Sequence, residues 1–148
     1  MGTVHAEITL KNASDVTQAV EGAISEKEVR QATLNALVDT GAWTLVIDEA
    51  NRKKLGLRIF KTGSGKLADG RTTEYCLAGP VEVIWKNRST NCDAIVLPEA
   101  DETLLGAIPL EAMDLMVNPL KGELVGVHGD HVVHSIKQLD PGTQRKIA

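Results

Sequence analysis

A carboxylate, a hydroxyl and a glycine follow one another at positions 39 to 41, directly after the apolar residues Leu37 and Val38. A carboxylate at the end of a buried strand is held in place and partly removed from water. Gly41 lets a backbone N–H approach the oxygens of Asp39. Asp39 is therefore predicted to be a positioned carboxylate, able to take or give a proton. The simpler alternative is that Asp39, Thr40 and Gly41 form only a turn.

The composition limits the classes of protein to consider. The chain has 148 residues, 43% of them hydrophobic and 24% charged, which fits one compact domain. Its net charge of −4 leaves no broad basic surface, so we do not expect nucleic acid as a partner. No apolar run approaches the roughly 18 residues of a membrane span, and the first seven residues lack a secretory pattern. We therefore expect a soluble, cytoplasmic protein that does not bind membranes.

Alternation of apolar and polar residues dominates the chain and predicts a mainly β domain. Near the N-terminus two paired strands are expected, over residues 4–10 and 16–24, on either side of turn residues. Further strands are expected over residues 29–38, 42–47, 81–85, 92–97, 115–117 and 124–127, the last four forming two hairpins.

Short helices and one projecting hairpin are expected between the strands. The first helix runs over residues 48–55, with Asp48 as its N-cap and Gly56 as its C-terminal stop. The second starts with Pro109 as its first helical residue and runs through Met113. The glycine-rich residues 61–71 contain Asp69-Gly70, a strong turn signal, and predict the projecting hairpin.

The last part of the chain is polar and contains Asp140-Pro141-Gly142. We expect residues 1–128 to form the domain and residues 129–148 to form a partly ordered tail.

Around Asp39 the sequence resembles the retropepsin-like aspartic proteases, the half-size family that includes retroviral proteases. In that family an apolar pair leads into Asp-Thr/Ser-Gly-Ala, as Leu37-Val38-Asp39-Thr40-Gly41-Ala42 does here. A flexible flap hairpin follows, here about residues 63–73, and then an apolar-apolar-Gly turn and a short helix, here from Leu104-Leu105-Gly106. The resemblance covers about residues 29–127. It implies a mainly β fold, a closed acid-protease β-barrel with one or two short helices.

The same resemblance implies an active site without a metal or another cofactor. The catalytic residues would be Asp39, Thr40 and Gly41, with Thr40 bonding across a dimer axis. The residues in contact with a peptide or protein substrate would be Ala42, Trp43, Leu67, Ala68, Asp69, Gly70 and Arg71. Trp43 departs from the family pattern, and its ring either narrows a substrate pocket or anchors the core.

A single Asp-Thr-Gly occurs in the chain, whereas an aspartic protease needs two carboxylates close together. The second must come from another copy, so the resemblance implies a twofold homodimer in which two Asp39 carboxylates share one proton. The resulting prediction is a homodimeric aspartic endopeptidase. The alternative is a catalytically inactive binding or dimerisation module with the same fold.

Other motifs favour different chemistry more weakly. Gly63-Ser64-Gly65-Lys66 lacks the spacing and the Ser or Thr of a phosphate loop. Cys76 and Cys92 are too few for a disulfide scaffold and are expected to be buried or half-buried thiols. A polar group near the end of the chain has side chains that can bind a metal (His128, Asp130, His131 and His134). An acidic stretch is expected to face solvent (Asp93, Glu99, Asp101 and Glu102), and Asn87-Arg88-Ser89 is expected to form a hairpin turn.

Overall fold

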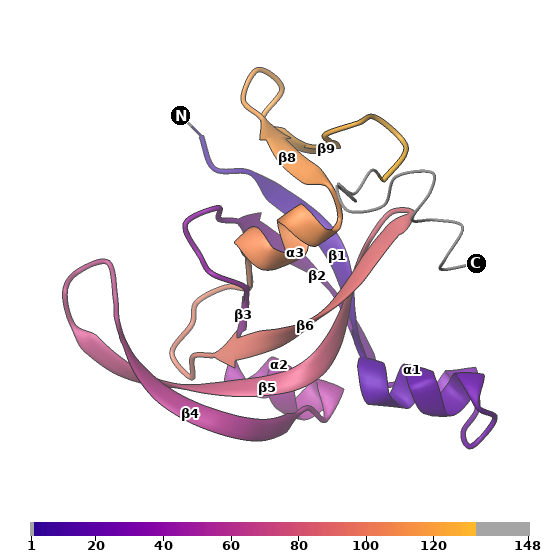
Figure 1. Cartoon of the computed structure of the whole chain (residues 1–148). Coiled ribbons are helices and arrows are strands. Elements are labelled where there is room, and N and C mark those ends of the chain that lie inside the picture. The colour runs from indigo at the N-terminus through magenta and orange to yellow at the C-terminus, as the bar shows by residue number, and fades with distance from the viewer. Residues whose placement is uncertain (1, 133–148) are drawn as a thin grey trace, which may run out of the picture.

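The computed structural model of the chain describes residues 2–132 (Figure 1). Within this range the fold is mainly β, as predicted, with a few short helices. In chain order the elements are β1 (His5–Asn12), α1 (Ala13–Val20), the 3-10 helix η1 (Glu26–Glu28), β2 (Gln31–Val38), β3 (Leu45–Ile47), α2 (Glu49–Leu55), β4 (Arg58–Lys66), β5 (Thr72–Trp85), β6 (Arg88–Val96), β7 (Leu104–Leu105), α3 (Ala107–Ala112), β8 (Leu115–Asn118) and β9 (Glu123–Gly126). The longest of these helices has eight residues, too few to cross a lipid bilayer.

Seven strands form one sheet in the order β1-β2-β7-β3-β6-β5-β4, and β8 and β9 form a separate two-stranded sheet. Strand β1 pairs antiparallel with β2 and also with β5, so the pairings of six strands return to β1. Strand β4 pairs only with β5 and forms the edge of the sheet. The β4–β5 hairpin is long and curves away from the rest of the sheet (Figure 1).

The short strand β7 brings together parts of the chain that lie far apart in sequence. It pairs parallel with β2, through Leu37 opposite Leu104 and Val38 opposite Leu105, and antiparallel with β3. The end of β2, where Asp39 follows, is therefore fixed by a strand more than sixty residues later in the chain.

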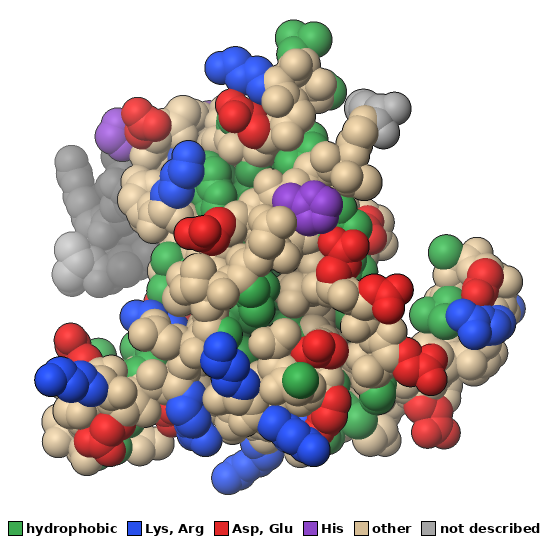
Figure 2. All heavy atoms as spheres, turned by 180° about the vertical axis from the view of Figure 1, so that it is seen from behind, with side chains coloured by type: hydrophobic (Ala, Val, Ile, Leu, Met, Phe, Trp, Pro, Cys, Tyr) green, Lys and Arg blue, Asp and Glu red, His purple; other side chains and the backbone are tan. Residues whose placement is uncertain are grey.

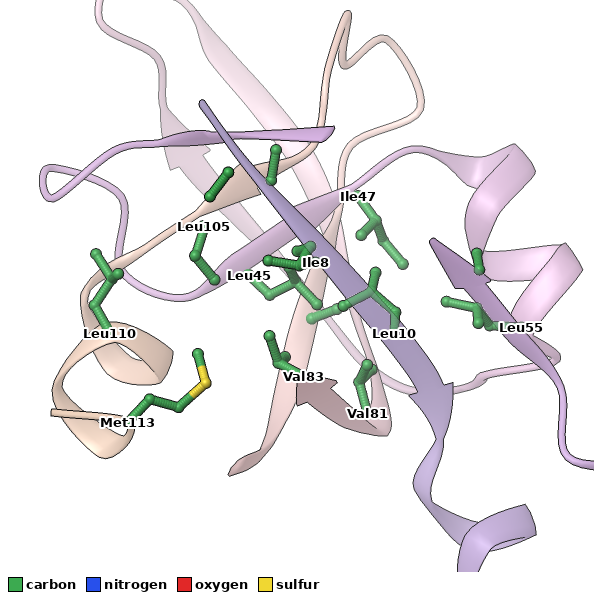
Figure 3. Packing of buried hydrophobic residues seen from close by; sticks show 14 of the residues in the cluster. Ile8, Leu10, Leu45, Ile47, Leu55, Val81, Val83, Leu105, Leu110 and Met113 are labelled. Carbon is green, nitrogen blue, oxygen red and sulfur yellow. The ribbon is translucent and has the colours of Figure 1, made fainter. Parts of the chain in front are cut away.

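The core lies between the strands and is filled with aliphatic side chains (Figure 3). Alternate residues of β1 point into it, because Ala6, Ile8 and Leu10 are buried while His5 and Glu7 are exposed. Burying a side chain of this size stabilises the fold by about 1.5 to 3 kcal/mol. The largest fully buried aliphatic side chains are Ile8, Leu10, Leu45, Ile47, Leu55, Leu105, Met113, Val81, Val83 and Val96.

The prediction of a strand over residues 16–24 is wrong, because Ala13–Val20 form helix α1. Asn12 caps this helix, since its side chain accepts a hydrogen bond from the N–H of Asp15 (3.0 Å). The apolar residues Val16, Ala19 and Val20 also have helical i, i+3, i+4 spacing, so the sequence pattern fits both structures. The chain therefore has three α-helices, rather than one or two, among the described residues.

Helix α2 confirms the predicted caps. The Asp48 side chain accepts from the N–H of Asn51 (2.9 Å), and Gly56 ends the helix with a left-handed backbone, at φ 64°. Helix α3 begins at Ala107, two residues before the predicted start, so Pro109 is its third residue rather than its first. Proline fits there because the first turn of a helix needs no intrahelical N–H donors.

A buried arginine attaches the β8–β9 hairpin to the main sheet. Arg88, at the start of β6, has a side chain only 2% exposed, and its Nη1 donates to the carbonyls of Met113 (2.9 Å) and Asp114 (2.8 Å). Its Nη2 donates to the carbonyl of Gly129. The Asp114 carboxylate lies 4.0 Å from the guanidinium and also bonds His128 (2.8 Å). The turn predicted at residues 87–89 therefore carries a structural arginine, which the sequence pattern does not indicate.

Candidate active site

Asp39 lies in the loop between β2 and β3, held by main-chain hydrogen bonds. Its N–H donates to the carbonyl of Leu105 (3.0 Å), and its own carbonyl accepts from the N–H of Ala42 (3.0 Å). Its Oδ1 accepts from the N–H of Gly41 (2.9 Å), which confirms the approach predicted from the sequence. The carboxylate is half-buried, while Thr40 and Gly41 are exposed. The loop thus presents a fixed carboxylate at the surface of the molecule.

Gly106 lets the start of α3 pack directly under this loop. A Cβ at position 106 would lie 2.3 Å from the carbonyl oxygen of Thr44 and 2.7 Å from that of Ala42, so only glycine fits. The close approach allows two hydrogen bonds from α3 to the loop. The N–H of Ala107 donates to the carbonyl of Ala42 (2.9 Å), and the N–H of Ile108 donates to the carbonyl of Trp43 (3.1 Å). The loop that carries Asp39 is therefore supported at Asp39, Ala42 and Trp43.

A cavity of about 530 Å³ lies beside Asp39. One wall comes from β2 and the loop after it, and the others come from the N-terminal segment and the β8–β9 hairpin. The lining residues are Gly2, Thr3, Val4, Leu37, Val38, Asp39, Thr40, Val117, Pro119 and Gly122. The walls from the N-terminal segment and the hairpin were not predicted, since nothing in their local sequence marks a site.

The turn predicted at Asp69-Gly70 is the tip of the β4–β5 hairpin. The N–H of Leu67 donates to the carbonyl of Arg71 (2.8 Å), which closes the turn. Asp69 braces it, because its carboxylate accepts from the N–H (3.0 Å) and the Nε (2.6 Å) of Arg71. Ala68, Asp69, Gly70 and Arg71 are exposed and Leu67 is half-buried. The tip and the Asp39 loop lie on the same side of the molecule in Figure 1.

A second cavity, also of about 530 Å³, lies between the hairpin and the loop after β6. The predicted substrate-contacting residues Leu67 and Arg71 line it, together with Thr72, Thr73, Glu74, Leu97, Pro98, Glu99 and Ala100. The segment 97–100 was not predicted to belong to a site, although Glu99 is exposed, as expected for the acidic stretch.

Within one chain the predicted site residues fall into two groups. Asp39 and Thr40 line the first cavity, and the hairpin residues Leu67 and Arg71 line the second. The ring of Trp43 is not part of the core, because the residue is 55% exposed. Of the two roles considered for Trp43, the one in the core is therefore excluded.

The Gly63-Ser64-Gly65-Lys66 motif lies in strand β4, paired with residues 72–75 of β5, and not in a loop before a helix. The ring of Tyr75 packs over Gly63, where a Cβ would lie 2.7 Å from the tyrosine oxygen. The two glycines of the motif thus serve the packing of the hairpin.

The thiol of Cys92 does not offer a nucleophile for an alternative reaction. Cys76 and Cys92 are free and half-buried, as predicted. Burial raises the pKa of Cys92 to about 11, so this side chain remains a neutral thiol at physiological pH.

The histidines near residue 130 do not form a metal site in the described part of the chain. Residues 2–132 hold no group of three or more His, Cys, Asp or Glu side chains placed to bind one ion. His128 instead bonds Asp114, and Asp130 and His131 are exposed. His134 and the rest of the predicted tail beyond residue 132 lie outside the described residues.

A family model described as aspartyl protease matches residues 19–108, more than half of the chain. The chain belongs to the aspartyl protease family. A solved structure, EIAV protease complexed with the inhibitor HBY-793, is similar to this chain in fold, with a TM-score of 0.54 at 20% identity. The match covers 74% of this chain and 86% of that one, and it supports a retropepsin-like fold. No curated protein matches the chain.

The family match covers the parts of the candidate site that could be predicted from the sequence. It includes the Asp39 loop, the β4–β5 hairpin and Gly106, all of which carry short motifs. It ends before the β8–β9 hairpin, which forms part of the cavity beside Asp39. The least predictable part of the site therefore lies outside the segment that the family shares.

Proposed function

We propose that two copies of the chain form an aspartic endopeptidase whose single active site contains Asp39 from both. The observation that carries this proposal is the Asp39 carboxylate, held at the surface by the N–H of Gly41 (2.9 Å) in a loop fixed by β7. One chain supplies one such group. A twofold axis beside Asp39 would bring the second, because residues near such an axis meet their own copies.

In the proposed reaction the two carboxylates share one proton, since two like charges at close range do not both ionise. The ionised Asp39 takes a proton from a water molecule, and the resulting oxygen attacks the peptide carbonyl. The protonated Asp39 donates to the carbonyl oxygen as it becomes tetrahedral. Collapse of this intermediate breaks the C–N bond. The amine leaves with the proton that the first Asp39 took from the water, and the second Asp39 recovers its proton from a hydroxyl of the intermediate.

The other predicted residues have supporting roles in this proposal. Thr40 bonds across the dimer axis and stiffens the paired loops, and Gly41 and Ala42 line the substrate groove. The β4–β5 hairpin acts as a flap, and its tip at residues 67–71 closes over the peptide and excludes water. The cavity lined by Leu67 and Arg71 would then accept substrate side chains.

The same proposal includes a closed barrel and a boundary between domain and tail. The return of the strand pairings to β1 supports the barrel. The proposed domain comprises residues 1–128, with residues 129–148 as the tail.

Cleavage by the full chain tests the proposal directly. Peptide hydrolysis would be measured between pH 4 and 7 for the protein, for Asp39→Asn and for Asp130→Asn, an exposed aspartate outside the site. Only Asp39→Asn should lose activity. Equal cleavage by all three proteins would refute the catalytic role of Asp39.

Mixing experiments test whether the site is shared. Asp39→Asn added in threefold excess to the wild type should reduce the activity per wild-type subunit to about one quarter, since most wild-type chains would then pair with an inactive partner. Sedimentation at micromolar concentration should show the dimer. A protein that forms this dimer and cleaves nothing would instead favour the inactive binding module.

A further inference from the structure

The cations of this acidic protein are distributed unevenly. Residues 50–68 contain six Lys or Arg and no Asp or Glu, whereas the remaining residues contain ten Lys or Arg and twenty Asp or Glu. Three of these six cations belong to α2 and three to β4. Figure 2 shows Lys and Arg side chains gathered at the lower centre of the rear face, over α2 and the start of β4.

Most of these cations lack an anionic partner. Arg52 is paired with Glu49. Lys53, Lys54, Arg58 and Lys61 are exposed, and none of them forms an ion pair with a residue in the described range. Their charges are therefore available to an external partner.

The first half of β4 is exposed in three ways. It is the edge strand of the sheet, so the N–H and C=O groups on its outer side have no strand beside them. All five residues from Arg58 to Thr62 are exposed, which means that neither face of this part of the strand is covered. The apolar Ile59 and Phe60 are 40% and 53% exposed within this stretch.

An irregularity in the pairing explains why two successive apolar side chains both reach solvent. Ile59 pairs with Ala78 and Lys61 pairs with the adjacent Leu77, so Phe60 is an extra residue in β4. A bulge of this kind changes the direction of the side chains on its strand. Lysines on an edge strand protect it against aggregation. Protection against aggregation does not explain why an isoleucine and the chain's one phenylalanine are exposed on the same part of this strand.

We propose that the edge of β4 at residues 58–62, together with Lys53 and Lys54 of α2, binds an extended acidic segment of a partner polypeptide. The segment would add as a further strand beside β4, using the free backbone groups, with its carboxylates near the four cations and its apolar side chains on Ile59 and Phe60. A membrane surface or a nucleic acid would use the charges but not the strand edge. The proposal does not depend on the catalytic role of Asp39.

Binding to a labelled peptide tests this inference on the full chain. The probe is a ten-residue peptide in which glutamate alternates with valine, compared with the same peptide carrying lysine in place of glutamate. The acidic peptide should bind and the basic one should not. The double variant Arg58→Gln, Lys61→Gln should bind at least about tenfold more weakly, whereas Lys27→Gln, Lys121→Gln, which removes as many exposed charges elsewhere, should bind as the wild type does.

Two further experiments test how the peptide binds and which class of partner this surface takes. A peptide N-methylated at every residue has no backbone N–H to donate from either edge, so it should lose binding. Amide exchange in β4 should slow only with the unmodified peptide. Equal binding of the N-methylated peptide, or equal loss in both double variants, would refute the inference. Tighter binding to vesicles of anionic lipid or to single-stranded DNA than to the acidic peptide would also refute it.

Discussion

Gly106 offers the sharpest test of how the candidate site is built. In the variant Gly106→Ala, the added Cβ would lie 2.3 Å from the carbonyl oxygen of Thr44, where ordinary contacts begin at 3.4 Å. The Asp39 loop and the start of α3 must then separate by about 1 Å. Overpacking of this kind costs about 1 to 3 kcal/mol, and the two hydrogen bonds from α3 to the loop add about 1 kcal/mol each. We expect a loss of about 3 to 5 kcal/mol in the free energy of unfolding.

Urea unfolding followed by tryptophan fluorescence would measure this loss. Gly22→Ala is a matched control, because Gly22 has a left-handed backbone, at φ 82°, but no atom within 4 Å of a Cβ built there. Gly22→Ala should lower the free energy of unfolding by the backbone strain alone, about 1 to 2 kcal/mol. If the protein cleaves peptides as proposed, the folded Gly106→Ala variant should also turn over about a hundredfold more slowly, since the loop that carries Asp39 has moved. Equal unfolding free energies for the two variants would refute the packing argument.

Three other predictions concern the stability and reactivity of single side chains. Arg88→Met should lower the free energy of unfolding by about 3 kcal/mol in the same assay, because it removes a buried donor to three carbonyls and the cation that lies 4.0 Å from the Asp114 carboxylate; a change below about 1 kcal/mol would contradict this role. Hydrogen bonds from Arg30 hold the pKa of Asp15 below its ordinary 3.8, so this carboxylate stabilises the fold above that pH and ceases to do so as the pH falls through its lowered pKa. The stability difference between the wild type and Asp15→Asn should therefore be about 2 kcal/mol at pH 7 and shrink as the pH falls below about 4, and a difference independent of pH would exclude this origin. With its pKa raised to about 11, Cys92 should be about one-thousandth thiolate at pH 8 and should resist alkylation in the native protein until unfolding exposes it, and rapid native labelling in a Cys76→Ser background would contradict its burial.

The parts of the fold that could be predicted from the sequence are those set by neighbouring residues. Asp48 and Gly56 mark the ends of α2 because caps act within one turn of a helix. The turn at Asp69-Gly70 and the loop after Val38 are likewise determined by residues next to one another in the sequence. The alternation along β1 was sufficient because one face of that strand is buried and the other is exposed.

The missed features depend on contacts between distant residues or on ambiguous spacing. Helix α1 has apolar residues that fit either a helix or a strand, and the cap at Asn12 decides between them. The insertion of β7 between β2 and β3 is a long-range pairing with no local signal. The burial of Arg88 was not predicted because arginine is ordinarily exposed, and here backbone carbonyls from three separate positions accept hydrogen bonds from its Nη1 and Nη2.

The β8–β9 hairpin is attached to the rest of the molecule by one guanidinium and by the packing of Leu115 and Leu124 in the core, which has a consequence for how the molecule opens. The hairpin shares no strand pairing with the seven-stranded sheet, and the cysteines are free, so no covalent bond ties it down. Its attachment is therefore the same under oxidising and reducing conditions. It can also dissociate as a cooperative unit while the sheet stays folded, and amide exchange in β8 and β9 should then report a lower opening free energy than in β1 or β5. The cavity beside Asp39 would lose a wall in that partly open state, while the loop that carries the carboxylate would keep its shape.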